Sequence, residues 1–110
     1  MKSRLENLLD FYKEDANDNF TLYALALEYI KAEDFEKALR FFQELKQKHN
    51  EYLPMYYHLG KLYEKLDDAD LASQTYLEGM KLAEKQDDKH TYAELKEAYN
   101  SFMGIDDEDW

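Results

Sequence analysis

The sequence contains no cysteine, and only one proline and three glycines occur among its 110 residues. Without cysteine the chain can form no disulfide, no thiolate metal site and no cysteine nucleophile. Sheet-rich folds usually need more glycine and proline in their turns, so their scarcity favours helices. Alanine, leucine, glutamate and lysine, which are good helix formers, are abundant. The length fits about one domain.

Basic residues are also scarce, since 14 lysines and arginines stand against 25 acidic residues and the net charge is −11. Such a chain repels the phosphates of nucleic acids and anionic lipids, so we expect it to bind neither nucleic acid nor membrane. A basic partner would be attracted, although acidic solvent-exposed faces alone would explain the charge. No apolar run is long enough to span a membrane and no signal peptide is evident, so the expected location is cytoplasmic.

No combination of residues suggests catalysis or a cofactor. The three histidines, His49, His58 and His90, have no nearby partners at metal-ligand spacing. Carboxylate pairs such as Asp67 with Asp68 fall in expected turns, where acids usually cap helices. There is no glycine-rich phosphate loop either. We therefore expect no catalytic residues, no metal site and no cofactor, and the chain is not expected to be an enzyme.

The sequence does contain an internal repeat with a period of 34 residues. The matched pairs are Leu22 with Tyr56, Leu25 with Leu59, Ala26 with Gly60, Tyr29 with Tyr63, Ala38 with Ala72, and Phe42 with Tyr76. Spacings of three and four residues place the members of each half on one face of a helix. A small residue in the middle, Ala26 or Gly60, lets a second helix approach closely. Each unit is therefore predicted to be a helix, a short turn and an antiparallel helix.

This pattern resembles the tetratricopeptide repeat family, whose signature of a large residue, Leu-Gly or Leu-Ala, then Tyr is matched by residues 56–63 and 22–29. The family's closing proline is absent, because Ala16, Asn50 and Glu84 stand at its positions. The resemblance implies an all-α fold of about six helices, in which antiparallel helix-turn-helix repeats stack as a short right-handed superhelix, an α-solenoid.

The same register divides the chain. We expect a single domain over residues 1–104, with full repeats at 19–52 and 53–86, a half-repeat helix at 2–14 and a capping helix at 88–103. The half-repeat helix would pack through Leu5, Leu8, Phe11 and Tyr12. The capping helix would begin at the N-cap Asp88 and keep a polar face of Lys89, Glu94, Lys96, Glu97 and Asn100 in solvent. Residues 105–110 would form a flexible acidic tail.

The resemblance implies a non-catalytic protein–protein interaction module, an adaptor or scaffold that holds a segment of another protein in a concave groove. The first helix of each repeat would line this groove, one position past the packing residues. The expected groove residues are Phe20, Tyr23, Leu27, Ile30, Lys31, Tyr57, His58, Lys61, Glu64 and Lys65. Two alternatives stay open: flanking helices could cover the apolar half, or the groove or capping face could build a structural homo-oligomer.

One subclass of the family clamps the C-terminal carboxylate of chaperones with basic and amide side chains. By spacing, its clamp positions are Tyr23, Leu27, His58, Asp88 and Tyr92 here. None carries the expected residue, and Asp88 would repel a carboxylate, so we predict no binding of such tails. Ile105 and Trp110 flank four acids, and this tail could either dock into a groove or serve only as a solubilising end.

Overall fold

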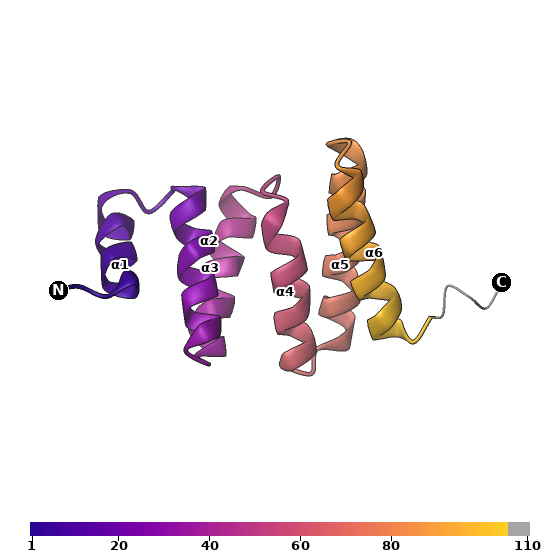
Figure 1. The fold of residues 1–110 in the computed structure, drawn as a ribbon, viewed down its shortest axis with the longest axis horizontal. Helices are drawn as coiled ribbons and strands as arrows, with labels where there is room; N and C mark the ends of the chain where they lie inside the picture. Colours follow the sequence, from indigo (N-terminus) through magenta and orange to yellow (C-terminus); the bar gives the residue numbers. More distant parts are fainter. Residues whose placement is uncertain (106–110) are drawn as a thin grey trace. The chain divides into compact units, whose positions relative to one another are not determined.

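The computed structural model describes residues 1–105, which form six α-helices and no strand (Figure 1). The helices are α1 (Arg4–Glu14), α2 (Asn19–Lys31), α3 (Phe35–Lys48), α4 (Pro54–Lys65), α5 (Ala69–Lys85) and α6 (Lys89–Met103). The all-α helical repeat architecture predicted from the sequence is confirmed. The expected acidic tail lies outside the described residues except for Ile105.

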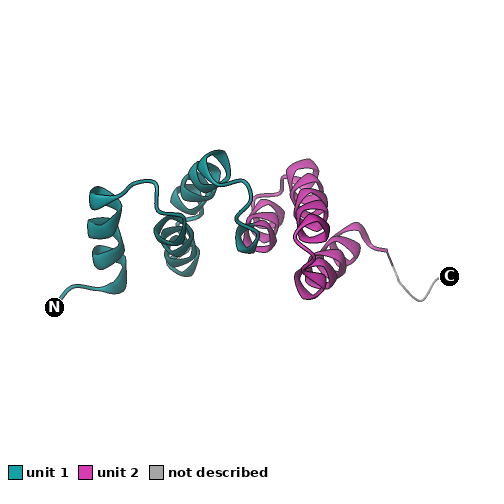
Figure 2. Cartoon of the chain, turned by 90° about the horizontal axis from the view of Figure 1, so that it is seen from above, with its two compact units in different colours: residues 1–55 teal, residues 56–110 magenta. Residues whose placement is uncertain are grey.

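The helices group into two compact units, residues 1–55 and residues 56–110 (Figure 2). In unit 1, α2 packs against α3 along the chain and against α1 before it. In unit 2, α5 packs against α6. A single domain over residues 1–104 remains a prediction.

Most helices begin at a side chain that accepts a hydrogen bond from the first turn. Ser3 and Glu6 form a reciprocal capping box at the start of α1. The four N-cap aspartates are Asp18, Asp34, Asp68 and Asp88, which start α2, α3, α5 and α6. The predicted N-cap Asp88 is thus confirmed, because its carboxylate accepts a hydrogen bond from the Thr91 N–H at 3.0 Å. Helix α4 instead begins with Pro54, which suits the first turn of a helix.

The same turn occurs three times, after α2, after α4 and after α5. Glu33, Asp67 and Asp87 adopt left-handed φ angles of 61°, 59° and 56°. The N–H of the following aspartate then bonds to the carbonyl oxygen five residues earlier, at 2.9 Å in each turn. This bond closes the preceding helix and places the next aspartate as an N-cap.

The twelve residues of the repeat signature are all buried. In unit 2, Gly60 leaves no room for a side chain, since a Cβ atom there would overlap the Tyr76 ring. A Cβ atom on Gly79 would lie 2.7 Å from the Tyr56 Cβ and 2.9 Å from the Leu95 Cδ1. These glycines therefore let α5 approach α4 and α6 closely.

In unit 1, polar contacts hold α1 and the following turn onto α3. The Tyr12 hydroxyl donates to the Glu44 carboxylate, with both oxygens at 3.0 Å. Its ring packs edge-on against Phe41, with 5.3 Å between the ring centroids. Lys48 donates to the Ala16 carbonyl oxygen at 3.1 Å and to Glu44 at 2.7 Å. The half-repeat helix is thus anchored to the first full repeat.

Two residues differ from the expectations. Phe11 was expected to pack, but it is 56% exposed. Asn100 was expected on the solvent face of α6, but it is only 9% exposed. Leu45 on α3 stands 34 residues after Phe11 and is fully buried. Helix α3 packs on the preceding helix α2, whereas no helix precedes α1 within residues 1–105.

Candidate functional site

Helix α2 has an apolar row outside its buried face. We call Phe20, Tyr23, Leu27, Ile30 and Lys31 the α2 face. Phe20 is 56% exposed and Lys31 is exposed, whereas Tyr23, Leu27 and Ile30 are half-buried. Because the apolar members are spaced by three or four residues, they lie along one side of the helix. The expected groove residues of the first repeat therefore share a face that is partly open to solvent.

Tyr23 is partly covered from within unit 1. Its ring centroid lies 5.3 Å from that of Tyr52, and the two rings are tilted by 58°. Tyr52 lies between α3 and α4, and its burial, followed by the charge of Asp18, raises the pKa of its hydroxyl. Sequence reasoning missed Tyr52, because helical spacing does not determine the path of a connection between helices. The two rings form an aromatic surface, while Phe20 stays exposed.

Helix α4 carries a more polar row. We call Tyr57, His58, Lys61, Glu64 and Lys65 the α4 face, and none of its members is fully buried. The rings of Tyr57 and His58 meet edge to face, with 5.4 Å between centroids. The Lys61 ammonium lies 5.7 Å from the Tyr57 ring centroid, within the range of a cation–π contact.

Glu64 connects the α4 face to the core of unit 2. Its carboxylate accepts a hydrogen bond from the Tyr76 hydroxyl and lies 3.7 Å from the Lys61 ammonium. Burial and the neighbouring Glu64 raise the pKa of Tyr76, so its hydroxyl stays protonated and keeps donating. The core thereby fixes Glu64, and Glu64 in turn helps to fix Lys61.

His58 is the one histidine on these two faces. Burial lowers its pKa, and the charge of Glu94 on α6 opposes this effect only in part. Its imidazole is therefore neutral at pH 7. In the described part of the chain, no group of three or more histidines and carboxylates is arranged to hold a metal ion.

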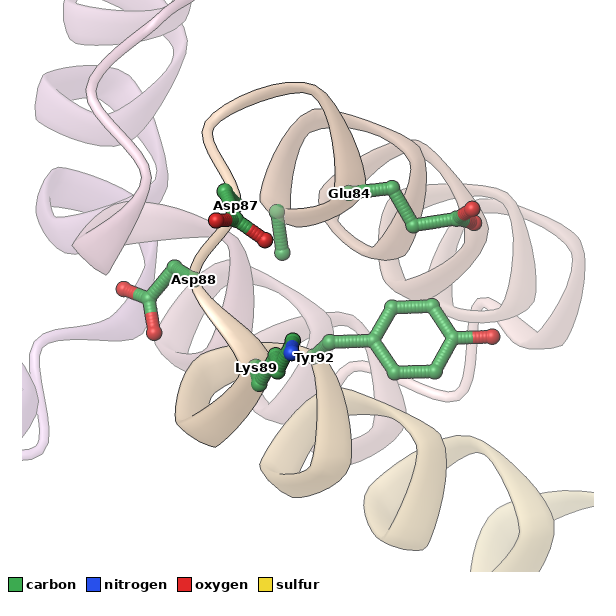
Figure 3. Close-up of a pocket in the computed structure, with 6 residues that line it drawn as sticks. Glu84, Asp87, Asp88, Lys89 and Tyr92 are labelled. Carbon is green, nitrogen blue, oxygen red and sulfur yellow. The ribbon is translucent and has the colours of Figure 1, made fainter.

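A hollow of about 450 Å³ lies where α5 ends and α6 begins. Figure 3 shows Glu84 extending from α5 and Tyr92 from α6, with Asp87 and Asp88 in the turn that joins them. Hydrogen bonds from the Thr91 N–H and hydroxyl lower the pKa of Asp88, which keeps its carboxylate charged. Two of the five clamp positions, Asp88 and Tyr92, thus lie in an acidic hollow that disfavours a carboxylate ligand. The repeat pattern gave no signal for this hollow.

Within the described residues, no helix is both long enough and apolar enough to cross a bilayer.

Comparison with known proteins assigns the family. The sequence pattern of the tetratricopeptide repeat matches residues 53–86. The crystal structure of a tetratricopeptide repeat domain protein from Salinibacter ruber is 40% identical, with a TM-score of 0.76, and the match covers 81% of this chain and 99% of that one. The chain belongs to the tetratricopeptide repeat family.

Two further structures agree with this assignment. A solution structure of a tetratricopeptide repeat domain protein from Salinibacter ruber is 38% identical, covers 87% of this chain and 97% of that one, and has a TM-score of 0.78. A protein from Bordetella parapertussis shares the fold at 20% identity, with a TM-score of 0.82 over 94% of this chain and 90% of that one. No curated protein sequence matches the chain.

Membership of the tetratricopeptide repeat family suggests a module for protein–protein interaction, and proteins of this family are generally non-catalytic. The α4 face lies on the first helix of the matched repeat at residues 53–86, and the α2 face lies on α2, which precedes it by 34 residues in the repeat pattern.

Proposed function

We propose that the chain is a non-catalytic adaptor or scaffold that binds an apolar or aromatic segment of another protein on the α2 face. The observation that carries this proposal is the exposure of Phe20, at 56%, at the head of a row of apolar side chains. Covering such a row removes apolar surface from water, which favours binding by about 25 cal/mol per Å² before the costs of association.

The chemistry of the α2 face fits a segment that inserts apolar side chains. Tyr23 and Tyr52 present rings that already contact each other, so little side-chain freedom is lost when a partner packs on them. Tyrosine and phenylalanine are also enriched at protein interfaces. A short helix or an extended strand can dock on such a row.

The α4 face offers polar groups to a partner. Lys61 is held between the Tyr57 ring and Glu64, and its side chain is still 44% exposed. Lys65 and His58 add further hydrogen-bonding groups, and Lys65 is exposed. The α4 face is therefore a second, more polar surface for a partner, and we assign most of the binding energy to the α2 face.

Charge narrows the class of partner. The net charge of −11 attracts segments that carry lysine or arginine over long range, although the two faces themselves carry Lys31, Lys61 and Lys65 against the single carboxylate of Glu64. The carboxylates of Asp87 and Asp88 disfavour an acidic C-terminal tail near α6. A peptide that ends in acidic residues and binds with micromolar affinity would contradict this part of the proposal.

The test uses peptides selected from a random displayed library against the 110-residue chain, with affinities measured by calorimetry. We expect Phe20→Ser and Leu27→Glu each to weaken binding at least tenfold, which is about 1.4 kcal/mol. Leu77→Glu is the matched control, because Leu77 is 47% exposed on α5 and lies outside both faces.

The control variant should keep the wild-type affinity. Equal losses in Leu77→Glu and Leu27→Glu, or no loss in Phe20→Ser, would contradict the proposal. Thermal unfolding of each variant separates lost binding from lost folding, and Phe20→Ser is the safer variant because its side chain is already exposed.

A further inference from the structure

The Glu64 carboxylate lies between a core tyrosine and a surface lysine. Its Oε2 atom accepts the hydrogen bond from the Tyr76 hydroxyl, and the same atom lies 3.7 Å from the Lys61 Nζ. This distance is too long for a hydrogen bond between an ammonium and a carboxylate. Tyr76 is 0% exposed, whereas the side chain of Lys61 is 44% exposed. The hydroxyl thus ties the carboxylate to the core, and Lys61 has no hydrogen bond to it.

A second triad of tyrosine, glutamate and lysine in unit 1 provides a contrast. The Tyr12 hydroxyl donates to both oxygens of Glu44 at 3.0 Å, and Lys48 donates to the same carboxylate at 2.7 Å. Lys48 follows its glutamate by four residues, which is the spacing and order that favour pairing on a helix. Lys61 instead precedes Glu64 by three residues. The first lysine is therefore bound by its own chain, and the second remains able to donate elsewhere.

Lys61 is held in place without such a bond. Its ammonium lies 5.7 Å from the Tyr57 ring centroid, within the range of a cation–π contact. Lys65 lies one turn further along the same side of α4 and is also exposed. The α4 face therefore carries two ammonium groups against one carboxylate, and that carboxylate already accepts the hydroxyl. This local positive charge, in a chain of net charge −11, is complementary to a carboxylate.

The first repeat lacks every polar group of this triad. At the equivalent positions, 34 residues earlier, it has Leu27, Ile30 and Phe42. Phe42 is 0% exposed, as Tyr76 is, so this core position needs no hydroxyl in order to pack. The hydroxyl is present in the repeat that has a glutamate for it to hold.

We infer that Tyr76 is a positioning residue, whose hydroxyl holds Glu64 off Lys61 so that Lys61 can bind an aspartate or glutamate side chain of a partner on the α4 face. This inference rests on the proposed function only in taking the α4 face as a surface for a partner. Without the hydroxyl, Glu64 loses its hydrogen bond to the core and pairs directly with Lys61. The lysine is then neutralised by its own chain and binds an acidic partner less well.

The first test needs no partner. Acylation of each lysine by N-hydroxysuccinimidyl acetate is followed by mass spectrometry, because a carboxylate bound to the amine slows this reaction. Lys61 should react several-fold more slowly in Tyr76→Phe than in the wild type. It should recover in Tyr76→Phe/Glu64→Gln, since glutamine carries no charge, while Lys48 reacts alike in all three chains. Equal rates for Lys61 in the wild type and Tyr76→Phe would overturn the inference.

The second test measures binding. Peptides are selected from a random displayed library against the 110-residue chain, counter-selected against Lys61→Gln, and synthesised with amidated C-termini so that any carboxylate belongs to a side chain. Changing the acidic residue of a selected peptide to its amide should weaken binding up to about fivefold, the range of exposed ion pairs. Calorimetry should show a similar loss for Tyr76→Phe with the unchanged peptide, and recovery in Tyr76→Phe/Glu64→Gln.

Tyr12→Phe is the matched control, because it removes a hydroxyl from a glutamate outside both faces and should leave the affinity unchanged. The inference is overturned if no peptide distinguishes the wild type from Lys61→Gln, or if the selected peptides lack acidic residues. It is also overturned if the double variant binds as weakly as Tyr76→Phe, the result expected of a purely structural role. All these variants keep Phe20, so the test of the α2 face by Phe20→Ser succeeds or fails independently.

Discussion

At the scale of single residues, close packing explains most directly why the smallest residues stand where they do. Gly60 is glycine because the Tyr76 ring occupies the place of its side chain. Tyr76 in turn is 0% exposed and donates its hydroxyl to Glu64, so the ring has little freedom to move aside. The equivalent residue in the first repeat is Ala26, which is also fully buried.

Gly60→Ala should therefore destabilise the chain although alanine is the better helix former. Overpacking in a core usually costs about 1–3 kcal/mol, against a gain in helix propensity of about 1 kcal/mol. We expect urea unfolding to show a net loss of up to about 2 kcal/mol. Gly60→Ala in a Tyr76→Leu background should lose much less, and an increase in stability of Gly60→Ala alone would contradict the packing account.

His58 should make stability depend on pH. Its pKa lies below the ordinary value of 6.5 because it is partly buried. Below pH 6.5, His58 therefore binds a proton more readily in the unfolded chain than in the folded chain. The free energy of unfolding should fall as the pH decreases below this value.

His58→Gln should remove this part of the pH dependence, as measured by urea unfolding at a series of pH values between about 5 and 8. His90→Gln is the matched control, because the His90 side chain is 87% exposed. An identical pH dependence in wild type and His58→Gln would show that His58 does not contribute.

At the scale of helices and turns, one turn geometry recurs in three of the five connections between the helices, at residues 33–34, 67–68 and 87–88. In each, a charged residue takes the left-handed conformation that glycine adopts without strain. The following aspartate satisfies both the end of one helix and the start of the next. Each turn thus combines a favourable helix cap with an unfavourable left-handed backbone conformation.

Glu33→Gly should raise stability. Relief of the left-handed conformation is worth about 1–2 kcal/mol, and the added freedom of glycine in the unfolded chain costs about 0.5–1 kcal/mol. We expect a net gain of about 0.5–1 kcal/mol by urea unfolding. Glu36→Gly, in the first turn of α3, should instead lose stability, and a loss in both variants would contradict the strain argument.

Helical periodicity accounts for what the sequence predicts well and for what it misses. Residues that pack within a repeat, such as Leu25 and Tyr63, repeat at 34 residues, so their burial follows from spacing alone. Phe11 lies on α1 and Asn100 on α6, outside the two 34-residue units, so the spacing within a repeat does not determine their burial. The Tyr23–Tyr52 contact depends on a connection, for which periodicity carries no information.

At the scale of the whole molecule, acidic charge should speed the encounter with a basic partner. The net charge of −11 acts over a screening length of about 10 Å at 0.1 M salt. For a selected peptide that carries lysine or arginine, we expect the association rate measured by stopped flow to fall several-fold as salt rises to about 0.5 M. The dissociation rate should change little, and a rate of association that does not depend on salt would contradict this role of the charge.

The central claim is that the α2 face holds a segment of another protein, and the most direct test is to map where such a segment binds. The ¹⁵N-labelled chain would be titrated with a library-selected peptide while amide chemical shifts are recorded. The account predicts the largest changes at Phe20, Tyr23, Leu27 and Ile30, with smaller changes on the α4 face. Changes concentrated on the outer side of α5 around Leu77, with the amides of α2 unaffected, would contradict it.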